Sequence, residues 1–215
     1  MDRGFVVSVV GSRSQLSEFR GYVDETSTRW LGPESWEHQT WHPDGMTRYV
    51  ALLRGVNVGG VTVKMADLAE VVRGLGYDDV KTVLASGNVL FSTTDAATTA
   101  KERLEAALRE RFGYEAWVHV LTEDAIAKIV EAYPFERSAE KHAYVVFILK
   151  PELLDALEAV DLDPAVEQAA RGDGVLYWTV PKGSTLDSAM GKAQGSGKHK
   201  PWLTTRNLNT LEKLL

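Results

Sequence analysis

Apolar runs of strand length alternate with helical stripes over most of this chain, and that alternation constrains its fold more than any single residue does. A continuous apolar run at 49–53 has the length of a strand, and apolar residues then recur at helical spacing until Gly76. Ser86 to Asn88 separates two short β-prone runs and is typical of a hairpin turn. The expected elements lie at 47–54, 65–75, 80–85, 89–92, 97–112 and 117–121.

The order of these elements, βαββαβ, is that of the ferredoxin-like unit. It predicts one antiparallel four-stranded sheet over residues 46–121 with two helices on one face. Leu68 and Leu104 belong to the two helical stripes, so we expect both to face the sheet.

Residues 122–215 predict a second small α+β unit, so the fold class is α+β throughout. Thr122 is a plausible helix N-cap, and Thr204 or Thr205 could cap a last amphipathic helix. No Pro/Gly/Ser linker separates the two units, so we expect them to pack tightly. Helices are expected at 122–133, 151–160 and 205–214, and strands at 144–149 and 176–180.

Residues 1–45 differ from the rest of the chain because they lose all periodicity after the apolar run at 5–10. We expect an N-terminal extension outside the core that the fold does not need. A strand begins directly after Met46, which makes Met46 a candidate start of translation. A genuine extension, or a small added strand at 5–10, remains an alternative.

The composition excludes several kinds of chemistry. The 215 residues include no cysteine, which excludes disulfides and thiolate nucleophiles and fits a reducing cytoplasm. The five histidines are scattered, so we expect no metal and no bound cofactor. No apolar stretch is long enough to span a membrane, and the net charge of −6 argues against dedicated nucleic-acid binding.

Two glycine-rich segments could hold phosphate, but neither matches a known motif. The loop 55–60 has Asn57 where a dinucleotide fingerprint needs glycine, so it is either a wide turn or a ligand-cradling loop. The segment 191–198 is spaced wrongly for a P-loop, and His199 stands where magnesium binding needs Ser or Thr. We expect a solvated flexible loop there.

Polar residues gather at the ends of the expected elements. Arg206 would lie at a helix N-terminus, which is unfavourable for a cation unless a carboxylate or an anionic ligand is near. We therefore expect one cleft between the two halves that binds an anion, although each residue could instead cap its own turn. The candidate residues are Arg54, Asn57, Gly59, Gly60, Ser86, Gly87, Asn88, Thr205, Arg206 and Asn207.

Three segments, MTRYVALLRGVNVGG, LASGNVLF and TTRNLNTLEKL, resemble the signatures of a widespread bacterial family known as domain of unknown function 1697. The resemblance runs from Met46 to Leu215. It implies a ferredoxin-like half followed by a second α+β subdomain and implies no activity. Its signature residues here are Arg54, Gly55, Asn57, Gly59, Gly60, Ser86, Gly87, Asn88, Thr205, Arg206, Asn207, Asn209 and Thr210.

Three functions remain open from the sequence. The first is a module that binds a small anionic or nucleotide-like ligand in the cleft. The second is a homo-oligomeric assembly protein whose polar signatures lock the fold. The third is an enzyme acting on a small anionic substrate, although no residue has an obvious nucleophile or base role.

Overall fold

The computed structural model describes residues 45–57, 62–199 and 202–215. Contacts divide the chain into Met1–Gln39 and Thr40–Leu215, and all described residues belong to the second part. The expectations for residues 1–44, and those for Gly59 and Gly60, lie outside the described residues. None of the helices in the described ranges combines the length and apolar character that a bilayer crossing needs.

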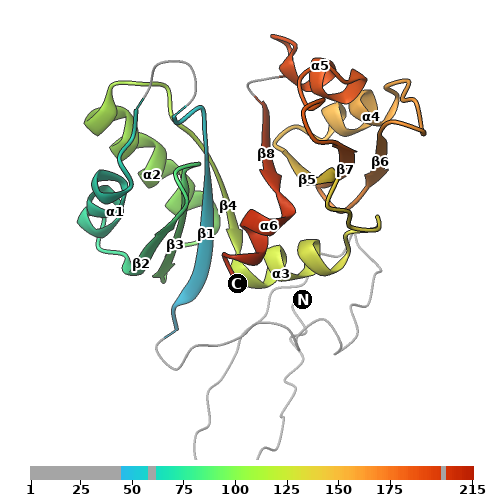
Figure 1. The fold of residues 1–215 in the computed structure, drawn as a ribbon. Coiled ribbons are helices and arrows are strands. Elements are labelled where there is room, and N and C mark those ends of the chain that lie inside the picture. The colour runs from blue at the N-terminus through green and yellow to red at the C-terminus, as the bar shows by residue number, and fades with distance from the viewer. Residues whose placement is uncertain (1–44, 58–61, 200–201) are drawn as a thin grey trace, which may run out of the picture. The chain divides into compact units, whose positions relative to one another are not determined.

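The first half folds as the predicted βαββαβ unit. Its elements are β1 (Thr47–Arg54), α1 (Met65–Gly74), β2 (Asp78–Val83), β3 (Asn88–Thr93), α2 (Ala97–Phe112) and β4 (Trp117–Thr122). The strands form one antiparallel sheet in the order β2-β3-β1-β4, with α1 and α2 on one face (Figure 1). The sheet and both helices are therefore as the sequence predicted.

Alternation along β1 places its side chains on the two faces of this sheet. Ala51 and Leu53 join a buried core with Leu68 of α1 and Leu104 of α2, and both helical leucines are fully buried. Leu52 points to the opposite face, which carries no helix of the βαββαβ unit, and enters a different core.

The second half repeats the element order and the sheet topology of the first, which the sequence did not predict. After α3 (Glu123–Glu131), the elements are β5 (Lys141–Ile148), α4 (Glu152–Glu158), β6 (Gln168–Arg171), β7 (Val175–Pro181), α5 (Ala189–Gly195), β8 (Leu203–Asn207) and α6 (Leu208–Glu212). The sheet order β6-β7-β5-β8 corresponds strand for strand to the first. Each half is thus a βαββαβ unit followed by a helix.

Equivalent positions in the two repeats can be assigned from the caps of α3 and α6. Thr122 and Asn207 each end the fourth strand of a repeat, and each side chain caps the helix that follows. Thr122 pairs with Tyr49 on β1, and Asn207 pairs with Tyr144 on β5. The two repeats are therefore in register along their fourth strands.

The predicted helix at 205–214 is wrong in its first turn. Residues 203–207 form β8, which pairs with β5, and the helix begins only at Leu208. The cap is Asn207 rather than Thr204 or Thr205. Pairing with β5 decides the outcome, because tertiary context overrides the local preference for a helix start.

Two further elements were missed. The chain forms α5 over 189–195, which overlaps the segment 191–198 that the sequence predicted to be a flexible loop. Ser188 caps this helix by accepting a hydrogen bond from the Gly191 backbone amide. The strand β6 has the sequence QAAR, which contains no β-branched or aromatic residue. It is a strand because it pairs with β7.

A shared core joins the two halves. It takes residues from the sheet faces opposite the α1/α2 and α4/α5 layers, together with residues of α3 and α6, the two helices that follow the repeats (Figure 1). Its members include Val50, Leu52, Leu90, Ile126, Val145, Phe147, Tyr177, Leu208 and Leu211. The halves are packed through this core rather than connected only by the chain.

The turn between β2 and β3 depends on Gly87, which has a φ of 72° and approaches another segment closely. A Cβ on Gly87 would lie 2.3 Å from Val56 Cγ2. We expect Gly87→Ala to lower the free energy of unfolding by about 1–3 kcal/mol, because the left-handed backbone and the overpacked contact both oppose a side chain. Urea denaturation measures the difference.

Two other glycines serve as controls for this prediction. Gly55 also has a positive φ, 74°, but open space around it, so Gly55→Ala reports the backbone contribution alone. Gly74 ends α1 with neither constraint, and Gly74→Ala should leave stability unchanged or slightly higher. Equal losses for Gly87→Ala and Gly55→Ala would contradict a role for the close contact.

Candidate functional site

Arg206 on β8 connects the two halves through a buried guanidinium. It donates hydrogen bonds to Asn88 Oδ1 at 2.6 Å and to the Leu53 carbonyl at 2.5 Å, both in the first half, and to Thr204 Oγ1 at 2.8 Å. The residue is 8% exposed, and burial lowers the pKa of its guanidinium to about 10. Among described residues its hydrogen-bond partners are neutral oxygens, so Arg206 neither pairs with a carboxylate nor requires an anion.

Asn88, at the start of β3, is fully buried and orients this guanidinium. Its Nδ2 donates to the Val83 carbonyl and to Ser86 Oγ, each at 2.9 Å, which leaves Oδ1 to accept from Arg206. The polar groups of this amide are therefore used within the protein.

Asn57 holds the loop after β1 against the β2–β3 turn. It adopts a φ of 56°, donates from Nδ2 to the Ala85 carbonyl at 2.6 Å, and exchanges hydrogen bonds with the backbone of Val63. Such a residue fixes a loop conformation, because its side chain replaces missing backbone partners. Asn57 is thus tied both to the β2–β3 turn and to Val63 at the far end of this loop.

The structure brings Asn57, Ser86, Asn88 and Arg206 to one region, and the hydrogen bonds made there are internal. Thr205 leaves this group because strand alternation turns it to the other face, where it donates to Gln194 Oε1 on α5 at 2.7 Å. Asn207 also leaves it and caps α6. The candidate residues therefore divide into a group at the β2–β3 turn and residues that lie elsewhere. Within that group Asn88 and Arg206 are buried and join the halves, while Asn57 and Ser86 are exposed.

Arg54 ends β1 beside Trp117, one of two tryptophans whose rings are in contact. It lies opposite Trp117 in the β1–β4 register, and burial lowers the pKa of its guanidinium. The Trp117 and Trp202 rings have centroids 5.6 Å apart, and Lys150 Nζ lies 3.5 Å from the Trp202 centroid. We call Arg54, Trp117, Lys150 and Trp202 the tryptophan cluster.

His119 lies two residues further along β4 and faces the second half. Its ring centroid is 5.6 Å from that of Phe147 on β5. Burial, together with the positive charges of Lys101 and Arg206, lowers the pKa of His119 to about 4. The imidazole is therefore neutral near pH 7 and acts as a packing group.

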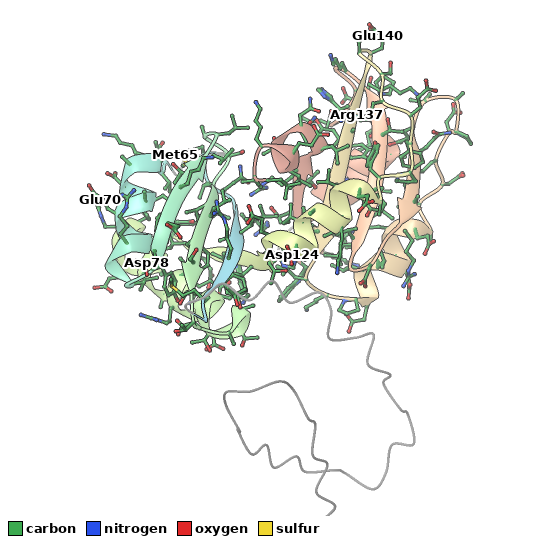
Figure 2. All side chains as sticks on the ribbon, turned by 90° about the horizontal axis from the view of Figure 1, so that it is seen from below. Met65, Glu70, Asp78, Asp124, Arg137 and Glu140 are labelled. Carbon is green, nitrogen blue, oxygen red and sulfur yellow. The ribbon has the colours of Figure 1, made fainter. Side chains whose placement is uncertain are left out.

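A polar cavity of about 510 Å³ lies in the second half, a size typical of small-molecule sites. Its lining comes from the segment between α3 and β5, where Figure 2 labels Arg137 and Glu140, and from β5, β7 and the start of α6. We call it the α6 cavity. The lining residues are Glu136, Arg137, Ser138, Ala139, Lys141, His142, Ala143, Thr179, Lys182, Asn207 and Asn209.

Hydrogen bonds fix how the two asparagines face the α6 cavity. Asn207 Oδ1 accepts from the Asn209 amide at 3.0 Å, and Asn209 Oδ1 accepts from Arg137, which also pairs with Glu212. The side-chain carbonyl oxygens of both asparagines are therefore used within the protein. Lys141 and Lys182 add ammonium groups that form no ion pair within the described part of the chain.

Of the candidate site residues predicted from the sequence, only Asn207 lines the α6 cavity. Lys141, His142 and Lys182 flank strand ends without any motif, and only their pairing across β5 and β7 brings them together. Trp117 and Trp202 were equally hidden, since they come from separate repeats. Within the described ranges, no group of three or more His, Asp or Glu residues could hold a metal ion.

Comparisons with known proteins give a family and a fold. The model of the family described as "Protein of unknown function (DUF1697)" matches residues 46–177. No curated protein matches the sequence. The chain is similar to the solved structure of the conserved bacterial protein SP0830 from Streptococcus pneumoniae, at 25% identity and a TM-score of 0.66, covering 79% of this chain and 97% of that one.

A second solved structure is much less similar. It is an unknown protein from Galdieria sulphuraria, with 12% identity and a TM-score of 0.26, covering 75% of this chain and 97% of that one. A TM-score of this size supports no structural argument. The structural comparison therefore rests on the likeness to SP0830, which is described as a conserved bacterial protein.

Proposed function

We propose that this chain, which belongs to the DUF1697 family of proteins of unknown function, is a binding module for a small multivalent anion. The α6 cavity supports this best. One observation carries the proposal: a cavity of ligand size is lined by Lys141 and Lys182, which form no ion pair within the described residues, and by two asparagines whose side-chain oxygens accept hydrogen bonds inside the protein. A phosphoryl or carboxylate group is the chemical complement of such a lining.

The charge of the α6 cavity supports the same conclusion. Arg137 is neutralised by Glu212, and Glu136 is the one acidic residue among the lining residues. Lys141 and Lys182 give the lining a positive excess in a chain whose net charge is −6. Local positive charge on an acidic protein attracts anions to this place rather than to the whole surface.

Thermal unfolding in phosphate tests the proposal. We expect sodium phosphate to raise the Tm above that in sodium chloride of equal ionic strength, because a ligand at 100 times its Kd adds about 2.7 kcal/mol. The double variant Lys141→Gln/Lys182→Gln should lose most of this gain. The measurement is calorimetric, at several phosphate concentrations.

A matched control is Lys81→Gln, which removes a lysine that is exposed on β2 in the other sheet. Its response to phosphate should equal that of the unchanged protein. If the double variant kept the full phosphate response, the anion would not bind in the α6 cavity and the proposal would fail. A Tm that is the same in phosphate and chloride would also contradict it.

A further inference from the structure

The tryptophan cluster is a second place where the chain gathers side chains suited to a ligand. The structure describes three tryptophans. Trp178 is an example of a tryptophan with a purely structural role, because it is 1% exposed and its Nε1 donates a hydrogen bond to Glu167. Trp117 and Trp202 are only partly buried and belong to none of the three buried cores. Packing within a core therefore does not account for either ring.

The duplicated fold places these two rings in contact. Trp117 lies five residues before the cap Thr122, and Trp202 lies five residues before the cap Asn207, so they occupy equivalent positions in the two repeats. Two backbone hydrogen bonds fix the position of Trp202. Its N–H donates to the His199 carbonyl, and its carbonyl accepts from the Leu149 N–H, each at 2.9 Å. Both indoles are thus presented from fixed strand ends.

Two cations complete the cluster. Arg54 shares its sheet face with Trp117, because directly paired residues of antiparallel strands point the same way. Lys150 is exposed and lies over the face of Trp202. Within the described residues neither cation has an ion pair with a carboxylate, so both are available to an anion.

Flat aromatic rings beside free cations match one class of small molecule better than others. A nucleobase stacks on an indole, and a phosphate bonds to guanidinium and ammonium groups. A simple inorganic anion would use the cations but would have no need of the tryptophans. A purely apolar ligand would leave both charges without partners.

We propose that the tryptophan cluster binds a nucleoside monophosphate, with the base on the indole of Trp202 and the phosphate between Arg54 and Lys150. The Lys150 ammonium now lies where the base would stack. It moves off the ring to the phosphate when the nucleotide binds. This site is separate from the α6 cavity and does not depend on the proposal made for it.

Indole N–H signals test this proposal in the full-length protein. Replacing Trp117 and Trp202 singly by Phe assigns their peaks in a ¹⁵N–¹H spectrum, and the buried Trp178 serves as an internal reference. We expect AMP to shift the Trp202 peak saturably, with the Trp117 peak following, and to leave Trp178 unmoved. Adenosine and inorganic phosphate should each bind more weakly than AMP, because each makes only one of the two kinds of contact.

Binding variants then separate this site from the α6 cavity. By calorimetry, Trp202→Leu should weaken AMP binding about 5-fold to 150-fold, the range expected for one base stacked on an aromatic ring. Arg54→Gln and Lys150→Gln should each weaken it about tenfold or more. Lys81→Gln should leave it unchanged, and Lys182→Gln should leave the AMP-induced shift of the Trp202 indole peak unchanged.

Two results would overturn the proposal. One is the absence of any saturable AMP shift at millimolar concentrations. The other is AMP binding that survives Lys150→Gln and Trp202→Leu but is lost in Lys182→Gln, which would place the nucleotide in the α6 cavity. Lys150 is exposed, so its variant remains informative even if Arg54→Gln reduces stability.

Discussion

Replacing Arg206 by leucine should lower the free energy of unfolding by about 2–4 kcal/mol, because the change leaves buried oxygens of both halves without donors. The Leu53 carbonyl and Asn88 Oδ1 would lose charged hydrogen bonds that no neighbouring side chain can replace. Burying the guanidinium is itself unfavourable, and leucine removes that penalty, which limits the net loss. Urea denaturation monitored by circular dichroism measures the change.

Two variants control for size and charge in this experiment. Arg171→Leu removes an exposed arginine whose ion pairs to Asp155 and Glu158 lie in solvent, and it should change stability by less than about 1 kcal/mol. Arg206→Lys keeps the charge but cannot reach the same acceptors as a guanidinium, so it should still destabilise. An Arg206→Leu protein as stable as Arg171→Leu would show that the network does not hold the halves together.

Leu104→Ala should lower the free energy of unfolding by about 2–5 kcal/mol, because it opens a cavity in the core between α2 and the first sheet. Leu104 is fully buried, and Leu68→Ala should have a similar effect from α1. Leu186→Ala is the matched control, since Leu186 is 81% exposed and should cost little. Losses below roughly 1 kcal/mol at both buried leucines would mean that neither helix packs as described.

The first half of the fold follows from the sequence because its local signals agree with its tertiary contacts. The run at 49–53 is apolar on both faces of β1, and the structure buries both faces. Gly113 ends α2 in the left-handed conformation that its position predicts. Sequence periodicity is sufficient to predict the helices and strands of a unit in which each element has its own apolar pattern.

The second half was less predictable because several of its elements exist only through their neighbours. The edge strand β6 has no strand-forming side chains and is held by β7. The first turn of the predicted last helix is instead β8, held by β5. Without these elements the second βαββαβ order could not be recognised, so the duplication remained hidden.

The candidate site shows the same limit. Polar residues at element ends predicted one shared site, and the structure joins only three of them, Ser86, Asn88 and Arg206, in one hydrogen-bond network. Asn57 bonds to the Ala85 carbonyl in the same turn, whereas Arg54 and Asn207 lie elsewhere. The partners of the network residues are backbone carbonyls and each other, which no spacing in the sequence reveals. The α6 cavity and the tryptophan cluster depend on long-range pairing, so their members were mostly missed.

The two repeats also differ at one informative place. Arg206 lies one residue before the cap Asn207, and the equivalent residue before Thr122 is Leu121. A dimer of two identical halves would have to bury an arginine twice or not at all, since symmetry repeats every side chain. Joining the halves in a single chain lets one carry the cation and the other its acceptors. A single chain thus permits an asymmetric contact between the halves. One buried guanidinium and its acceptors determine how the halves pair, and no second buried charge is needed.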